Sequence, residues 1–179
     1  MYYLGVTIAV ASSATTPQGT YQGSFLLRVT DTTKGKTTTK AFTVTARVDP
    51  VITLAAAAGM GFGDVYSGPA AGTVVLAPEG TRTASPGVIL GSTTAVGPAI
   101  LMVRGAPNTT FAIMLPASVT LHGPAGTLLV SPFTCQPGPC GLLSETGEQQ
   151  LQVGATLNLG QNQPDGDYLG TFAVSVAYN

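Results

Sequence analysis

A seven-residue segment with Tyr, Gly and Phe at alternate positions occurs twice in this chain. The copies are GTYQGSF at residues 19–25 and GDYLGTF at residues 166–172. The flanking strands match too, and each copy follows a Pro-x-Gly turn. The second copy closes the chain after a domain's length of sequence, whereas the first stands near its beginning. We therefore expect the tail of one β-domain followed by a whole second one.

Each copy has the chemistry of a turn followed by a strand. Proline fixes φ and glycine accepts positive φ, so Pro-x-Gly favours a turn. A tyrosine just after such a turn is typical of the tyrosine corner of immunoglobulin-like sandwiches. The alternative is ordinary strand composition repeated by chance. The residues of this predicted corner motif are Tyr21, Gly23, Phe25, Tyr168, Gly170 and Phe172.

The composition favours many short strands. Charged residues make up 8% of the chain, against a soluble average of about 25%, and 44% are hydrophobic, with 23 Gly and 13 Pro. This hydrophobicity argues against disorder. Alternating segments separated by turn residues predict an all-β fold, an immunoglobulin-like, pilin-like sandwich or a barrel. We expect strands at 4–10, 21–30, 37–49, 51–54, 73–77, 86–90, 99–104, 110–115, 118–122, 127–131, 150–153, 155–159 and 168–177, and at most one helical turn at 55–58.

The first 49 residues cannot form a complete β-domain alone. Three expected strands give one sheet and no second sheet to cover it, and so short a segment buries little apolar surface. We therefore divide the chain into a partial β unit at 1–49 and a sandwich domain at 50–179. The partial unit must be completed by the rest of the chain or by another copy.

Residues 37–48 are the candidate completing strand, because they alternate most regularly. Phe42, Val44, Ala46 and Val48 lie on one face of this segment, and Thr43, Thr45 and Arg47 lie on the other. Burying Phe42, Val44 and Val48 would contribute about 5–9 kcal/mol, at about 1.5–3 kcal/mol each. Addition of such a strand to a sheet edge is how pilin subunits complete one another.

Charge is divided unevenly between the two parts. Residues 1–49 hold five basic and two acidic side chains, net +3, and residues 50–179 hold two basic and six acidic ones, net −4. This division favours salt-dependent head-to-tail contact between copies; the alternative is a chance scatter of loop charges. The total of −1 gives no reason to expect nucleic acid. No stretch has the roughly 18 apolar residues of a membrane-spanning helix, and residues 1–14 lack the positive start of a signal peptide.

Few residues have the grouping that catalysis or metal binding needs. Cys135 and Cys140 enclose Gln-Pro-Gly-Pro, which bends the chain back so that the thiols can meet; a disulfide closing so small a loop would stabilise by about 2 kcal/mol. The alternative is free thiols, and two Cys with one His are too few for zinc. His122 lacks a triad partner. Three further features each have a functional and a purely structural interpretation. Asp165 and Asp167 fit a calcium loop or an ordinary turn, and Glu145 and Glu148 fit an acid/base pair or solvated loop carboxylates. Asn108 fits a glycosylation site or an unmodified loop.

Residues 50–179 resemble a known family of secreted bacterial proteins, domain of unknown function 4402. The resemblance is carried by ITL at 52–54, GFGDV at 61–65, GTVV at 72–75, PEGTR at 78–82, GVIL at 87–90, LPASVTL at 115–121, VGATL at 153–157 and the alternating ending at 166–178. It implies an exported immunoglobulin-like sandwich similar to fimbrial subunits, without a catalytic site. Family members begin near residue 37, so residues 1–33 depart from the pattern and resemble a family ending.

The sequence therefore predicts a structural protein, not an enzyme. We expect a subunit of an extracellular, cell-surface filament or pilus, a homopolymer in which each copy donates residues 37–48 to its neighbour. No cofactor, metal or small-molecule substrate is expected, and a periplasmic chaperone and an outer-membrane usher are candidate partners during export. The alternative is an adhesin or carbohydrate-binding module, although 7% aromatic residues and no Trp give it little support.

Overall fold

The computed structural model describes residues 18–179 and divides the chain into two units, one up to Pro50 and one from Val51 onward. The described residues contain strands and no helix, which confirms the all-β prediction. None of them, accordingly, forms an apolar helix able to span a membrane. The expected strand at 4–10 lies outside the described residues.

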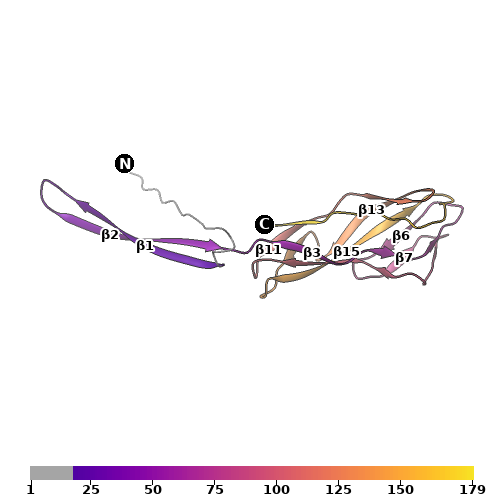
Figure 1. The fold of residues 1–179 in the computed structure, drawn as a ribbon, viewed down its shortest axis with the longest axis horizontal. Coiled ribbons are helices and arrows are strands. Elements are labelled where there is room, and N and C mark those ends of the chain that lie inside the picture. Colours follow the sequence, from indigo (N-terminus) through magenta and orange to yellow (C-terminus); the bar gives the residue numbers. More distant parts are fainter. Residues whose placement is uncertain (1–17) are drawn as a thin grey trace. The chain divides into compact units, whose positions relative to one another are not determined.

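The described part of the first unit is a two-stranded antiparallel hairpin (Figure 1). Strands β1 (Gly19–Thr30) and β2 (Thr37–Val48) pair along their whole length, from Gly19 opposite Val48 to Thr30 opposite Thr37. Their turn is closed by backbone bonds between Asp31 and both Gly35 and Lys36. An isolated two-stranded hairpin is marginally stable at best in water, so this unit by itself needs something to cover it.

The second unit contains the remaining strands. They are β3 (Thr53–Ala58), β4 (Gly61–Phe62), β5 (Val65–Tyr66), β6 (Gly72–Leu76), β7 (Arg82–Ala84), β8 (Ile89–Leu90), β9 (Val96–Gly97), β10 (Ala99–Arg104), β11 (Thr110–Met114), β12 (Val119–Gly123), β13 (Gly126–Gln136), β14 (Cys140–Leu142), β15 (Glu148–Leu159) and β16 (Ser175–Tyr178). A seven-stranded sheet is built around β15, with β12 and β13 on one side of it and β10, β3, β6 and β7 on the other. The strands β14, β11 and β16 form a second sheet.

The two larger sheets share one apolar core. Phe111 and Ile113 of β11 cluster with Leu101 and Val103 of β10 and with Leu151 of β15. These buried side chains alternate along their strands, as expected where one face of each sheet is covered. The arrangement is consistent with a β-sandwich.

Several expected elements differ from the observed ones in type or extent. Residues 55–58 form the end of β3 and not a helical turn, because they pair with β10 across a bulge. The expected strands 150–153 and 155–159 are one continuous strand, β15. The expected strand 168–177 is paired only at Leu169 and at 175–178. This last difference leaves part of the repeated segment without a neighbouring strand.

Candidate functional site

The hairpin of the first unit has one apolar face. Cross-strand pairs that share this face include Phe25 with Phe42, Gly23 with Val44, and Tyr21 with Ala46. The two phenylalanine rings stack with centroids 5.3 Å apart. The opposite face carries threonines, Ser24, Gln22 and Arg47.

No other strand in the described part of this unit covers the apolar face. Phe42 remains 42% exposed, Leu27 40% and Val29 60%. Monomeric proteins seldom leave such contiguous apolar surface open, and a patch of this kind marks an interaction site. The predicted donor residues Phe42, Val44, Ala46 and Val48 all lie on this face of β2.

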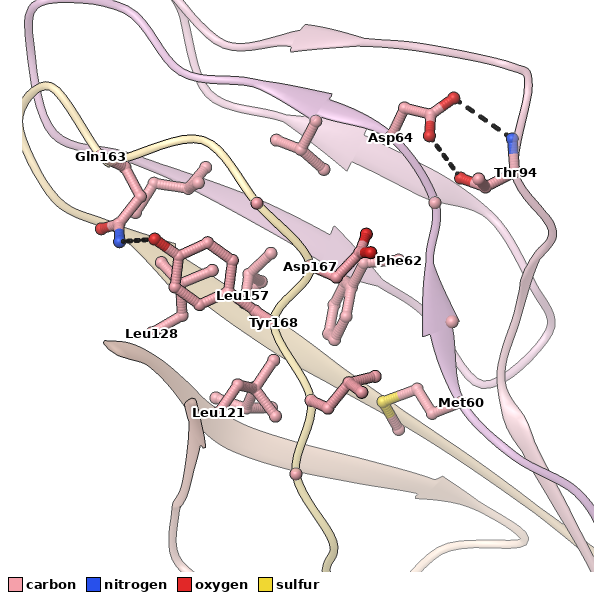
Figure 2. Close-up of a pocket in the computed structure, with 18 of the residues that line it drawn as sticks. Met60, Phe62, Asp64, Thr94, Leu121, Leu128, Leu157, Gln163, Asp167 and Tyr168 are labelled. Carbon is pink, nitrogen blue, oxygen red and sulfur yellow. Dashed lines mark hydrogen bonds between the residues drawn. The ribbon is translucent and has the colours of Figure 1, made fainter. Parts of the chain in front are cut away.

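The second unit contains a cavity of about 810 Å³, lined by both apolar and polar side chains, which we call the groove. One wall is residues 60–67, including β4 and β5, and the facing wall is residues 163–172. Its floor is made by apolar side chains of β12, β13 and β15 in the seven-stranded sheet: Val119, Leu121, Leu128, Val130, Phe133, Leu157 and Leu159. Figure 2 shows Met60 and Phe62 from one wall and Asp167 and Tyr168 from the other, with Leu121, Leu128 and Leu157.

The two walls of the groove differ in their backbone pairing. Strand β4 pairs with β9 and β5 with β8, and the carbonyl oxygens of Phe62 and Asp64 accept hydrogen bonds from Arg82. On the facing wall, residues 170–174 belong to no ladder in the described structure. Unpaired backbone groups at a strand edge form a template for another strand. The groove therefore has an apolar floor and one wall whose backbone groups pair with no described strand.

Tyr168 fixes the wall made by residues 163–172. Its hydroxyl donates to the Pro164 carbonyl oxygen at 2.7 Å and accepts from Gln163 Nε2 at 2.8 Å. Its ring packs on Gly123, where an added Cβ would lie 2.6 Å from a ring carbon. A tyrosine bonded to backbone a few residues upstream is the geometry of a tyrosine corner. The predicted corner thus has this geometry at Tyr168; the residues before Gln18 needed for comparison at Tyr21 lie outside the described residues.

Replacing Tyr168 with Phe should lower the free energy of unfolding by about 1 kcal/mol, because an average buried hydrogen bond contributes about 0.5–1.5 kcal/mol. Urea unfolding followed by circular dichroism measures this. The matched control is Tyr66→Phe, since Tyr66 is 57% exposed and should give no change. Equal effects of the two substitutions would contradict the assigned role of the Tyr168 hydroxyl.

Asp64 and Arg82 order the opposite wall. Arg82 Nη1 donates to the carbonyl oxygens of Phe62 at 2.5 Å and Asp64 at 3.3 Å, and Nη2 donates to that of Gly91. The Asp64 carboxylate accepts from Thr94 Oγ1 at 2.6 Å, from the Thr93 hydroxyl, and from the backbone N–H of Thr93 at 2.9 Å. Sequence reasoning assigned no role to Arg82, because its partners are main-chain atoms of distant segments.

These donors lower the pKa of Asp64 from 3.8 to about 2, first through the hydroxyls of Thr93 and Thr94. A carboxyl whose folded pKa is depressed stabilises the fold above its unfolded pKa, and this contribution is lost as the pH falls. The stability difference between wild type and Asp64→Asn should therefore be constant above about pH 5 and disappear towards pH 2.

Carboxyl-carbon NMR titration measures the Asp64 pKa directly. Thr94→Val removes one donor and should move the pKa back towards 3.8. An Asp64 midpoint at its ordinary value in the wild-type chain would contradict this hydrogen-bonded arrangement.

The other residues singled out from sequence do not come together in one site. Cys135 on β13 and Cys140 on β14 are both unbonded, so the disulfide stays a prediction; burial raises the pKa of the Cys135 thiol. Glu148 pairs with Arg104 at 2.8 Å, whereas Glu145 is exposed in the preceding turn. His122 is exposed on β12, and its backbone pairs with Leu169.

Asp165, Asp167 and Asn108 are the remaining residues singled out from the sequence. Asp165 and Asp167 lie at the groove. Asn108 adopts φ of 55° beside the turn at Pro107. No group of three or more His, Cys, Asp or Glu side chains within 18–179 is arranged to hold a metal ion. The groove and the hairpin face are therefore the features to which a function can be attached.

Comparison with known proteins gives one result for the second unit. The model of a family described as a domain of unknown function, DUF4402, matches residues 52–178. No curated protein matches the chain. No solved structure matches it either.

Proposed function

The chain belongs to the DUF4402 family, and from this premise we propose that it is a structural subunit of an extracellular filament or pilus. Copies would polymerise by β-strand complementation, in which a strand of one subunit completes the sandwich of the next. The observation that carries the proposal is the uncovered apolar face of the β1–β2 hairpin, where Phe42 is 42% exposed and Val29 60% exposed.

Burial on a second copy would offset this exposure. Fully burying a large apolar side chain contributes about 1.5–3 kcal/mol, and the hairpin carries several of them on one face. Main-chain hydrogen bonds along a sheet edge would add to this, as in other complexes formed by strand addition. Among residues 18–50, a two-stranded sheet has no second layer to supply that burial.

Opposite charges on β2 and on the groove favour association of the hairpin of one copy with the groove of another. Strand β2 carries Lys40 and Arg47, and the charged residues that line the groove are Asp64, Asp165 and Asp167. Opposite charge on two surfaces speeds their encounter and suppresses wrong pairings. Assembly should accordingly be faster at low salt than at high salt.

Electron microscopy of the purified chain, together with light scattering over a range of concentrations, tests the proposal. The expected result is filaments whose mass grows with protein concentration. Monodisperse particles at all concentrations would contradict it. As a control, a chain without residues 37–48 should remain monomeric under the same conditions, since it lacks the candidate donor strand.

A further inference from the structure

The two copies of the repeated segment have related backbones but different pairing. Gly19 and Gly166, at equivalent positions, have φ of 150° and 142°. After Gly19, the first copy continues as β1 and is paired throughout with β2. After Gly166, the second copy pairs with another strand only at Leu169 until Ser175. The first copy therefore has a paired strand, β2, where the second copy has none in the described structure.

We propose that β2 of a second copy of this chain binds in the groove along residues 166–172, in the register that β2 adopts on β1. This inference rests on the proposed function and specifies the site of complementation. Tyr168 would then lie opposite Ala46, Gly170 opposite Val44 and Phe172 opposite Phe42, as Tyr21, Gly23 and Phe25 do in the hairpin. To bind there, β2 leaves β1 of its own chain and pairs with the equivalent edge at residues 166–172 of the other copy.

The backbone of the groove wall is oriented for such pairing. Leu169 donates to and accepts from His122 on β12, at 3.0 and 2.8 Å. Successive residues of an extended strand direct their backbone groups to opposite edges. Tyr168, Gly170 and Phe172 therefore direct theirs away from β12, to the edge that no described strand occupies.

The groove has the depth and extent for the four predicted donor side chains. In the proposed register Phe42, Val44, Ala46 and Val48 lie opposite Phe172, Gly170, Tyr168 and Gly166, which all line the groove. Beyond Phe172 the lining ends, and β16 comes into contact with β3. Gly170 packs directly on β12, since an added Cβ there would lie 2.7 Å from Leu121 Cδ2 and 3.0 Å from the Thr120 carbonyl oxygen. The donor segment thus coincides with the open part of the wall.

The same register pairs opposite charges. Arg47 lies opposite Thr20 in the hairpin, and the residue equivalent to Thr20 in the second copy is Asp167. Both Arg47 and Asp167 are exposed, and Arg47, which forms an ion pair with Asp49 at 2.8 Å in the hairpin, would turn to Asp167 in the complex. Directly opposed residues of opposite charge stabilise a strand pair, and like charges destabilise it. This pairing favours β2 as the occupant over a segment of neutral or acidic sequence.

Cysteine cross-linking between separately prepared chains tests the register. In a background with Cys135→Ser and Cys140→Ser, a full chain carrying Thr43→Cys is mixed with one carrying Thr171→Cys, because Thr43 would lie opposite Thr171. Both positions are exposed, and directly opposed Cα atoms lie about 4.5–5.5 Å apart, within the roughly 4.4–6.8 Å that a disulfide spans. The expected product under mild oxidation is a covalent heterodimer that neither chain forms alone.

The matched control replaces Thr43→Cys with Thr39→Cys. Thr39 is on the same face of β2, four residues away, about 13 Å along the strand, and should give at least tenfold less heterodimer. Filaments without a preference for the Thr43 pair would overturn the groove and register but leave strand complementation standing. A monomer at every concentration would overturn both. A Thr43/Thr171 double variant that cross-links only within one chain would also overturn the second copy as occupant.

Discussion

A chain carrying Val44→Asp should remain monomeric at concentrations at which the wild-type chain assembles. The substitution places a carboxylate in the middle of the apolar face of β2, where Val44 is half-buried beside Gly23. Moving an unpaired charge into an apolar groove costs several kcal/mol. Each 1.4 kcal/mol is a factor of ten in an equilibrium constant, so the critical concentration should rise by about a hundredfold or more.

Thr43→Asp is the matched control for this experiment. It introduces the same charge one residue away, on the opposite, exposed face of β2. Its effect on assembly should be small, because the carboxylate stays in water. Sedimentation of polymer at increasing concentrations of each variant measures the difference. Equal critical concentrations for the two variants would mean that the apolar face of β2 is not the one buried in the polymer.

Phe111→Ala should destabilise the second unit by about 3–5 kcal/mol, the usual cost of removing a fully buried aromatic side chain. Phe111 is 0% exposed and packs so closely on Gly141 that an added Cβ there would lie 2.3 Å from the ring. Domains are stable by only about 5–15 kcal/mol, so the denaturant midpoint should fall markedly. Met114→Ala on the same strand, where the side chain is 53% exposed, should shift the midpoint little.

Guanidinium unfolding of each full-length variant, monitored by circular dichroism, measures these shifts. An effect of Phe111→Ala no larger than that of Met114→Ala would contradict the assignment of β11 to the core. Val44→Asp should leave the unfolding of the second unit unchanged.

Alternation along the chain predicted individual strands well. The expected segment at 37–49 is observed as Thr37–Val48, because one face is uniformly apolar and the other is rich in threonine. Alanine misled at 55–58, where high helix propensity suggested a helical turn. Pairing of Ala55 and Ala56 with β10 decides the structure there instead. Local propensity is a weak guide where a neighbouring strand supplies the hydrogen bonds.

The sequence did not distinguish a glycine at a turn from a glycine at a close contact between two strands. The expected break at Gly154 is absent, because this residue lies inside β15 and makes a close approach to β6. An added Cβ at Gly154 would lie 2.2 Å from the Leu76 carbonyl oxygen. Glycine in a strand can mark the contact of two backbones as well as a turn. Only the position of the neighbouring strand distinguishes the two cases.

The groove itself could not be predicted from the sequence. Its walls and floor come from segments at 60–67, 93–95, 119–133 and 157–172, and nothing local shows that they meet. The repeat predicted a strand at 168–177, whereas residues 170–174 belong to no ladder in the described structure. Local sequence does not show whether a strand-like segment finds a pairing partner.

The pairing of β1 with β2 has a consequence for the speed of polymer growth. The transfer of β2 gives up its pairing along the whole of β1 and gains pairing only along residues 166–172, so the net gain has to come from newly covered side chains. The activation barrier, by contrast, includes the separation of twelve opposed residue pairs. Elongation should then become independent of subunit concentration once opening of the hairpin limits the rate.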